Sequence, residues 1–257
     1  METIDISHYK WCTEPIEHIK DVKRPTTRFS KRDICNFTGR TRIGSKSANG
    51  EVFLFETNPD SVIKVIPYRK GTSELGYSRK ASSLVKAGKS PFFPVVFHTG
   101  KCKETWYSSG SSESSYFIIS ERAWGDLQYL YREYYRRNLE MTVADWKAVI
   151  RQVLSAIFDI QKYLKIIHND IKFENILVTL SDSKCVQILL SDFGESCDLT
   201  SSEQRSYDAS RLFDVLSLKA HLPQEILELS EKSTKYVNRH LTDENVVEKV
   251  RDRFWTI

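Results

Sequence analysis

His168-Asn169-Asp170-Ile171-Lys172-Phe173-Glu174-Asn175 is the stretch that decides the fold of this chain, and the tripeptide Asp192-Phe193-Gly194 completes it. Two short apolar runs, 176–180 and 186–190, separate these motifs and are typical of buried strands. The polar residues are therefore expected in loops at strand ends. Carboxylates, an amide and an ammonium group in such loops offer oxygen ligands for a hard cation, with a positive charge beside them.

The identity and order of these residues are too specific for coincidence. At about one in twenty per fixed position, seven fixed residues match by chance on the order of once in 10⁹ alignments. The first stretch resembles the catalytic loop of eukaryotic-type protein kinases, and Asp192-Phe193-Gly194 resembles their DFG motif. The resemblance implies an α+β, bilobal protein-kinase-like fold, with a small β-rich N-lobe and a helical, shortened C-lobe.

The resemblance also implies a role for each residue of the motifs. Phosphoryl transfer needs a held nucleotide, metal ions that neutralise charge, and an oriented hydroxyl group. In the family pattern Asp170 orients the substrate hydroxyl or accepts its proton, and Lys172 offsets charge on the transferring phosphate. Asn175 and Asp192 hold Mg²⁺, and ATP is the donor. All four residues are present, which argues against a pseudokinase.

Lys64 is the next candidate. It lies in the middle of the apolar run 62–66, where an unpaired ammonium group would be costly to bury. It resembles the strand lysine of kinases that contacts the α- and β-phosphates of the nucleotide. Its expected carboxylate partner is Glu74, near the start of a helix predicted over 73–87. The spacing between the two is short for the family, so a first-turn glutamate favoured by the helix dipole is the alternative.

The phosphate-covering loop resembles the family least. Gly44, Gly50 and Val52 fit the pattern G-x-G-x-x-G-x-V, but the middle glycine is absent and the loop is one residue longer. Glycine matters in such a loop because the backbone comes close to phosphate oxygens. The run ending in Glu121 and Ala123 resembles the strand and hinge that pair with adenine, which assigns these two residues to nucleotide binding.

Three parts follow from the patterns along the chain: an N-terminal extension, residues 1–40, an N-lobe, residues 41–122, and a C-lobe, residues 123–257. The N-lobe has strand-like runs from Thr41 onward and the predicted helix. Two more strands are predicted at about 94–107 and 116–122. The Ser-rich stretch 108–115 is predicted to be the flexible loop that joins them.

The C-lobe is predicted to be mostly helical. Asp126 is expected to cap a short helix, and Thr142 to open a longer one with Asp145 in a capping box. Apolar residues recur along this longer helix at steps of three and four, which predicts one buried stripe: Val143, Trp146, Ile150, Val153, Ile157, Ile160 and Leu164. Further helical patterns cover about 207–219, 223–231 and 242–254.

Composition sets the remaining expectations. The net charge of +4 comes without a long basic run, so nucleic-acid binding is not indicated. The odd number of cysteines and the absence of CxxC spacing predict free thiols in a reducing compartment: Cys12, Cys35, Cys102, Cys185 and Cys197. No segment approaches the length of a membrane span. An intracellular, cytoplasmic protein without a membrane partner is therefore expected.

The chain departs from the family pattern in the segment after Gly194. Asn169 replaces the arginine of His-Arg-Asp, which pairs with a phosphorylated activation loop in the family, so no such switch is expected. Residues 195–206 form a short segment without Ala-Pro-Glu, and Asp208 fits the aspartate that opens the next helix and braces the catalytic loop. These features are similar to the short kinases of large DNA viruses, which makes viral origin and the host cytoplasm expectations too.

The leading hypothesis is a serine/threonine protein kinase that acts on hydroxyl groups of a protein substrate. Lys172 in the Asp-x-Lys-x-x-Asn spacing favours Ser/Thr over Tyr within the family. A small-molecule kinase on a related fold stays open, because the short segment after Gly194 favours it although Asp-Phe-Gly does not. A binding scaffold that keeps the kinase fold without turnover is the third possibility.

Overall fold

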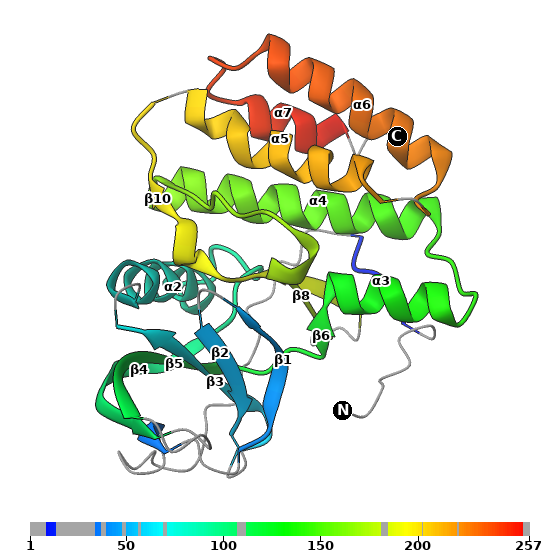
Figure 1. Ribbon diagram of the computed structural model, residues 1–257. Coiled ribbons are helices and arrows are strands. Elements are labelled where there is room, and N and C mark those ends of the chain that lie inside the picture. Colours follow the sequence, from blue (N-terminus) through cyan, green and yellow to red (C-terminus); the bar gives the residue numbers. More distant parts are fainter. Residues whose placement is uncertain are drawn as a thin grey trace. The chain divides into compact units, whose positions relative to one another are not determined.

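The computed structural model describes residues 9–13, 34–36, 40–47, 50–55, 58–68, 71–106, 112–180, 185–201, 203–219 and 221–253. These residues form two compact units (Figure 1). The sheet unit consists of the described residues within Asp21–Ser83 and Pro94–Arg122. The helical unit consists of those within Met1–Lys20, Leu84–Phe93 and Ala123–Ile257. The predicted α+β fold class, with a β-rich part and a helical part, is confirmed.

Five antiparallel strands form the sheet unit in the order β1-β2-β3-β5-β4. They are β1 (Arg42–Ser47), β2 (Gly50–Leu54), β3 (Ser61–Pro67), β4 (Val96–Trp106) and β5 (Ser112–Glu121). Alternate side chains of a strand point to opposite faces of the sheet. On β3, Ile63 and Val65 therefore enter one apolar core, whereas Lys64 and Ile66 lie on the opposite face. The first core holds Ile34, Phe53, Phe55, Ile63, Val65, Cys102, Phe117 and Ile119.

Helix α2 (Gly71–Lys86) begins two residues before the predicted start at 73. Its residue Leu75 packs against Ile66, Val96 and Ile118, on the face of the sheet that carries Lys64. The position of Leu75 brings the preceding residue, Glu74, to the same face.

The prediction that 108–115 is a loop is wrong at its C-terminal end. Ser112 pairs with Trp106 and Ser115 pairs with Cys102, so β5 begins at Ser112. Ser115 is completely buried. A strand ladder is made by backbone groups, so serines continue it wherever a neighbouring strand supplies the partners.

The helical unit is built around α4. Its helices are α3 (Leu127–Arg136), α4 (Val143–Asp159), α5 (Glu203–Ser217), α6 (Gln224–Arg239) and α7 (Val246–Arg253). Helix α7 packs against α4, α5 and α6 (Figure 1). The three predicted C-terminal helices are confirmed, although α5 begins earlier and α6 ends later than the pattern indicated. In the described part of the chain no helix is long and apolar enough to cross a membrane.

Short strands complete the helical unit. They are β6 (Gly125–Asp126), β7 (Ile166–Ile167), β8 (Ile176–Leu180), β9 (Val186–Leu190) and β10 (Cys197–Asp198). Strands β6, β8 and β9 form one sheet in this order, and β7 pairs with β10. Helix α4 lies against β9.

The predicted stripe is confirmed as the buried side of α4 and of the π-helical turn that continues it, Ile160–Leu164. Asp145 N–H donates to Thr142 Oγ1 (3.1 Å), and Thr142 N–H donates to Asp145 Oδ2 (2.9 Å), which is the predicted capping box. Asp126 caps α3 as predicted, accepting from Tyr129 N–H (2.7 Å). Five members of the stripe are buried and its two end residues, Val143 and Leu164, are half-buried: Trp146, Ile150, Val153, Ile157 and Ile160.

Two disulfide bonds join four of the five cysteines: Cys12–Cys185 in the helical unit and Cys35–Cys102 in the sheet unit. The prediction of free thiols is therefore wrong for these four residues and holds for Cys197. Local spacing could not reveal the pairs, because the partners lie 173 and 67 residues apart in the sequence. The cysteines therefore give no support for a reducing compartment, since disulfides persist mainly in oxidising surroundings.

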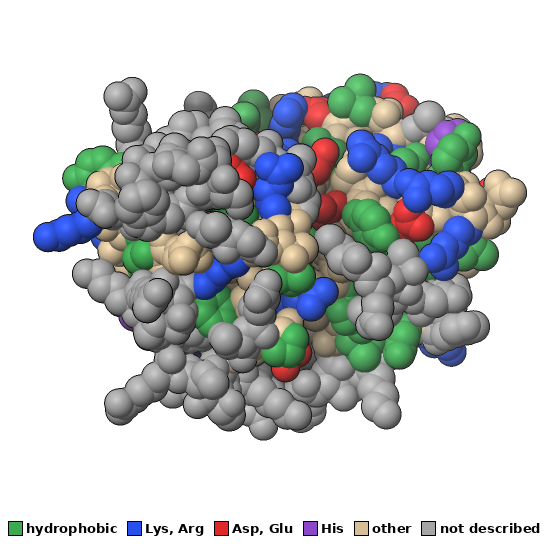
Figure 2. Space-filling model, turned by 60° about the horizontal axis from the view of Figure 1, so that its bottom comes forward, with side chains coloured by type: hydrophobic (Ala, Val, Ile, Leu, Met, Phe, Trp, Pro, Cys, Tyr) green, Lys and Arg blue, Asp and Glu red, His purple; other side chains and the backbone are tan. Residues whose placement is uncertain are grey.

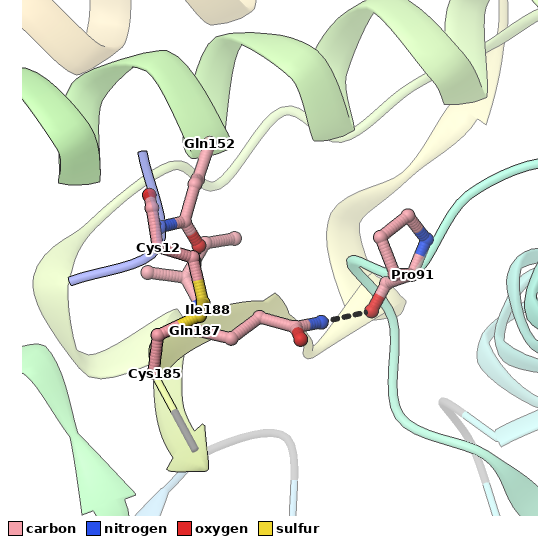
Figure 3. The surroundings of a disulfide bond; sticks show 6 residues. All are labelled: Cys12, Pro91, Gln152, Cys185, Gln187 and Ile188. Atoms are coloured by element: carbon pink, nitrogen blue, oxygen red, sulfur yellow. Dashed lines mark hydrogen bonds between the residues drawn. A yellow bond between two sulfur atoms is a disulfide. The ribbon is translucent and has the colours of Figure 1, made fainter. Parts of the chain in front are cut away.

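The first disulfide fastens residues 9–13 to the edge of β9 (Figure 3). Cys12 N–H donates to the Val186 carbonyl oxygen (3.0 Å), and the segment runs parallel to β9. Gln152 of α4 bridges the two: its Nε2 donates to Cys12 O (3.0 Å), and its Oε1 accepts from Ile188 N–H (2.9 Å). Part of the predicted N-terminal extension is thus joined to the helical unit by a β-bridge between Trp11 and Val186.

Removing this disulfide should lower the stability of the protein. A bond that closes so long a loop restricts the unfolded chain strongly. We expect the double substitution Cys12→Ser and Cys185→Ser to lower the free energy of unfolding by about 2–5 kcal/mol, measured by urea unfolding without reductant. Substituting Cys35 and Cys102 together, which closes a shorter loop, is the matched comparison. Unchanged unfolding, with free thiols at both positions in the wild-type protein, would contradict the expectation.

Asp159 is an acid at the C-terminal end of α4 whose surroundings disfavour its charge. Burial raises the pKa of its carboxyl group to about 6, and the positive charges of Arg251 and Lys162 oppose this only in part. The folded state therefore binds a proton more tightly than the unfolded state does. The protonated Asp159 carboxyl group therefore stabilises the folded state. This contribution is fully present below about pH 4 and is lost as the pH rises through 6.

Asp159→Asn should remove this pH dependence because an amide does not titrate. Relative to the variant, the wild-type free energy of unfolding should fall by about 2–3 kcal/mol between pH 4 and pH 7. Urea unfolding of both proteins across this range measures the difference. Parallel curves for the two proteins would show that Asp159 does not have a raised pKa.

Candidate active site

The stretch 168–175 forms a loop between β7 and β8, and Asp208 of α5 holds its backbone. Asp208 Oδ2 accepts from His168 N–H (2.8 Å), and its Oδ1 accepts from Asn169 N–H (2.9 Å). The carboxylate is completely buried. The predicted bracing contact is present, but α5 begins at Glu203, so Asp208 lies inside the helix and does not open it.

His168 links the loop to the residue that precedes Asp192. Its ring Nε2 lies 2.9 Å from the Ser191 carbonyl oxygen, and its Nδ1 accepts from Asp170 N–H (3.4 Å). With Nδ1 as an acceptor, the proton belongs on Nε2. Burial lowers the pKa of His168, so the ring is neutral near pH 7 and acts as a structural link.

The Asp170 carboxylate is oriented by two neighbours. Its Oδ2 accepts from Lys172 Nζ (2.5 Å) and from Asn175 Nδ2 (2.9 Å), and Asn175 Nδ2 also donates to the Asp170 carbonyl oxygen (2.8 Å). The side chains of Asp170 and Lys172 are 23% and 41% exposed, whereas Asn175 is buried. A restrained carboxylate and an ammonium group are thus open to a ligand, and an amide holds them from below.

Asp192 is tied to the same loop through Ser191. The Asn175 carbonyl oxygen accepts from Ser191 N–H (2.9 Å) and from Ser191 Oγ (3.1 Å). Asp192 has a φ of 64°, in the left-handed region that few non-glycine residues adopt. The buried ring of Phe193 packs on His168 and anchors this turn. Sequence reasoning missed Ser191, for which adjacency to Asp192 was the only available signal.

Oxygen donors suited to a hard cation are present at Asn175 and Asp192. The Nδ2 of Asn175 is used by Asp170, and its Oδ1 accepts no hydrogen bond from the described residues. Across the described ranges, no group of three or more His, Cys, Asp and Glu side chains could hold a metal by itself. Two oxygen donors suit Mg²⁺, which keeps water and phosphate oxygens in its shell.

The sheet unit carries the other predicted residues. Lys64 Nζ lies 2.6 Å from Glu74 Oε1, and the two side chains are 16% and 2% exposed. The ion pair expected from the sequence is present despite the short spacing between its members. A carboxylate this deeply buried is strongly destabilised if its cation moves away. The Lys64 ammonium group is therefore held in position beside Glu74.

Position 50 can accept only glycine, for a reason that the sequence did not indicate. Its φ is 132°, and a Cβ there would lie 2.2 Å from the Val65 carbonyl oxygen on β3. The close approach is thus between neighbouring strands. Gly44 lies in β1 and Val52 in β2, opposite Lys64. Residues 48–49 of the predicted phosphate-covering loop lie outside the described residues.

Glu121 has a structural contact that sequence reasoning missed. Its Oε1 accepts from Val95 N–H (2.9 Å), and its own N–H donates to the Val95 carbonyl oxygen (3.0 Å). The side chain thus joins the end of β5 to the start of β4. Ala123, the second predicted hinge residue, is half-buried and begins the last stretch of the helical unit.

Charged side chains are mixed on the surface. On the face shown in Figure 2, Lys and Arg side chains lie among acidic, hydrophobic and other side chains.

A β-rich unit with a buried Lys–Glu pair, and a helical unit with a braced Asp-Lys-Asn loop, together define the kinase class. A protein-family model described as Protein kinase domain matches residues 99–237, more than half of the chain. The chain therefore belongs to the protein kinase family. Lys64 and Glu74 precede the matched residues. A comparison with curated proteins finds no match.

Gly50→Ala should destabilise the sheet unit, because the new methyl group would overlap the Val65 carbonyl oxygen. We expect a loss of about 1–3 kcal/mol in the free energy of unfolding, the range for overpacking. Gly76→Ala on α2 is the matched control, since nothing lies within 4 Å of its added Cβ and alanine favours a helix. Thermal unfolding of the three proteins tests this, and equal melting temperatures for both variants would contradict it.

Proposed function

We propose that this protein is a serine/threonine protein kinase that transfers the γ-phosphate of ATP to a hydroxyl group of a protein substrate. The observation that carries the proposal is the Asp170 carboxylate, restrained by Lys172 and Asn175 and still partly exposed. A carboxylate held in this way can accept a hydrogen bond from a substrate hydroxyl and take its proton.

Lys172 would stabilise charge during the transfer. Its ammonium group is close to Asp170 and is 41% exposed, so a phosphate group can approach it. A fixed positive charge beside the transferring phosphoryl group offsets the negative charge that develops there. The Asp-x-Lys-x-x-Asn spacing supports Ser/Thr rather than Tyr as the hydroxyl, by resemblance to the family.

Asn175 and Asp192 would hold Mg²⁺, which when bound neutralises charge on the phosphates of ATP. In the sheet unit, the Lys64 ammonium group fixed by Glu74 would contact the α- and β-phosphates. The resemblance to the family supports nucleotide contacts from Gly44, Gly50, Val52, Glu121 and Ala123. The segment 195–206 is short, and Asn169 has no positive charge to pair with a phosphate group there. Both features support activity without phosphorylation of that segment.

A small-molecule kinase is the second candidate function. The short segment after Gly194 favours it, because protein kinases use the residues there to hold an extended peptide. Viral origin and a place in the host cytoplasm stay predictions from resemblance. The two disulfides weigh against a reducing compartment.

The test is phosphate transfer from labelled ATP with Mg²⁺ to casein, histone or myelin basic protein. We expect transfer by the wild type, loss on chelation of the metal, and a reduction of about 10²–10⁴-fold in Asp170→Asn. Asp192→Asn should fail similarly, whereas Asp214→Asn, which changes an exposed carboxylate on α5, should keep full activity. Acid hydrolysis of the labelled protein should yield phosphoserine or phosphothreonine.

Each other result points to a different function. Transfer only to small molecules would establish the second candidate. Binding of ATP without transfer to any acceptor would overturn the proposal and leave a scaffold. Labelled phosphotyrosine would keep the kinase and reject the serine/threonine assignment.

A further inference from the structure

Asn169 has a backbone conformation that few side chains tolerate. Its φ is 66°, in the left-handed region, where asparagine is several-fold enriched among non-glycine residues. In this conformation its N–H donates to Asp208 Oδ1 (2.9 Å). Its side chain reaches a second element, the segment that follows Gly194.

The Asn169 amide makes two contacts with that segment. Its Nδ2 lies 3.1 Å from the Glu195 carbonyl oxygen and 3.2 Å from Cys197 Sγ. An amide nitrogen carries two hydrogens, so these contacts use both donors. The side chain of Asn169, which directly precedes Asp170, is thus bonded to residues 195–197.

Two other contacts hold the same segment. Strand β10 pairs with β7 through Cys197↔Ile167, and Ser196 Oγ donates to the His168 carbonyl oxygen (3.2 Å). Both involve the backbone of the residues that lead into the loop. None of these links carries a charge, so the segment is held in place without an added anion.

From this geometry we propose that Asn169 is a positioning residue that fixes Asp170 relative to residues 195–197. The site is then kept in its working arrangement without a phosphate group on that segment. The catalytic consequence rests on the proposed function, whereas the contact between Asn169 and residues 195–197 does not.

Cys197 provides a readout that does not depend on activity. The described residues include all five cysteines, and four of them form disulfides, so Cys197 is the one thiol of the oxidised protein. Cys197 is half-buried, and its sulfur accepts from the Asn169 amide. Loss of this amide uncovers the sulfur and loosens the segment, which should speed its alkylation.

The experiment compares Asn169→Gly with the wild type. Glycine keeps the left-handed conformation but has no amide. Without reductant, we expect Cys197 in Asn169→Gly to react with iodoacetamide about five- to tenfold faster, as for the loss of one or two hydrogen bonds. We expect kcat to fall by a similar factor, with the KM for ATP little changed.

Asn138→Gly is the matched control, because Asn138 is also left-handed (φ 51°) and is exposed beyond the end of α3. It should leave both readouts unchanged. Asn169→Asp keeps the shape of the side chain but cannot donate, so it should lower kcat as Asn169→Gly does. Its negative charge beside Cys197 disfavours the thiolate and should slow the alkylation instead. Phosphatase treatment should leave the kcat of the wild-type protein unchanged.

Unchanged alkylation in both Asn169 variants would overturn the contact. Faster alkylation with unchanged kcat would overturn the positioning role, and a tenfold loss of kcat on phosphatase treatment would overturn independence from phosphate. An inactive wild type would reject the proposed function instead, and the alkylation rates would then still decide whether Asn169 holds residues 195–197.

Discussion

The candidate site depends on one buried carboxylate. Asp208 is withdrawn completely from water, and the two backbone N–H groups of His168 and Asn169 compensate that burial. Because the loop backbone is held at this point, the His168 ring can reach Ser191, and Ser191 in turn bonds Asn175. Asn175 then orients Asp170. Each link uses hydrogen bonds between buried or half-buried groups, so displacement of one member would leave its partners unsatisfied.

Strand β9, which leads to Asp192, is held along both edges. Strand β8 pairs with it on one side, and residues 10–12 bond its first residue, Val186, on the other. Gln152 bonds both the added segment and β9, and the Cys12–Cys185 disulfide closes the arrangement (Figure 3). The backbone groups of Val186 and the N–H of Ile188, which β8 does not bond, thereby find partners. The covalent link lets a segment far away in the sequence restrain the strand that positions a candidate metal ligand.

The sheet unit places its charged pair by strand alternation. Lys64 lies between Ile63 and Val65, which both enter the apolar core, and so its side chain points to the face against which α2 packs. Glu74 meets it there as a nearly buried carboxylate. Strands β2 and β3 also approach each other closely at Gly50, where any larger residue would collide with the Val65 carbonyl oxygen.

The sequence alone determined the kinase class, the two-part division, the stripe on α4 and its capping box, because these follow from local periodicity and from residue types in a fixed order. Lys64 and Glu74 could be paired because an apolar strand must compensate a buried charge. Only the tertiary structure decided the cysteine pairs, the β-bridge between Trp11 and Val186, the start of β5 and the contacts of Asn169, Ser191 and Glu121. These arise between residues distant in the sequence, where no local pattern records which groups meet, and the physical requirement that buried donors find acceptors selects the partners only once the chain has folded.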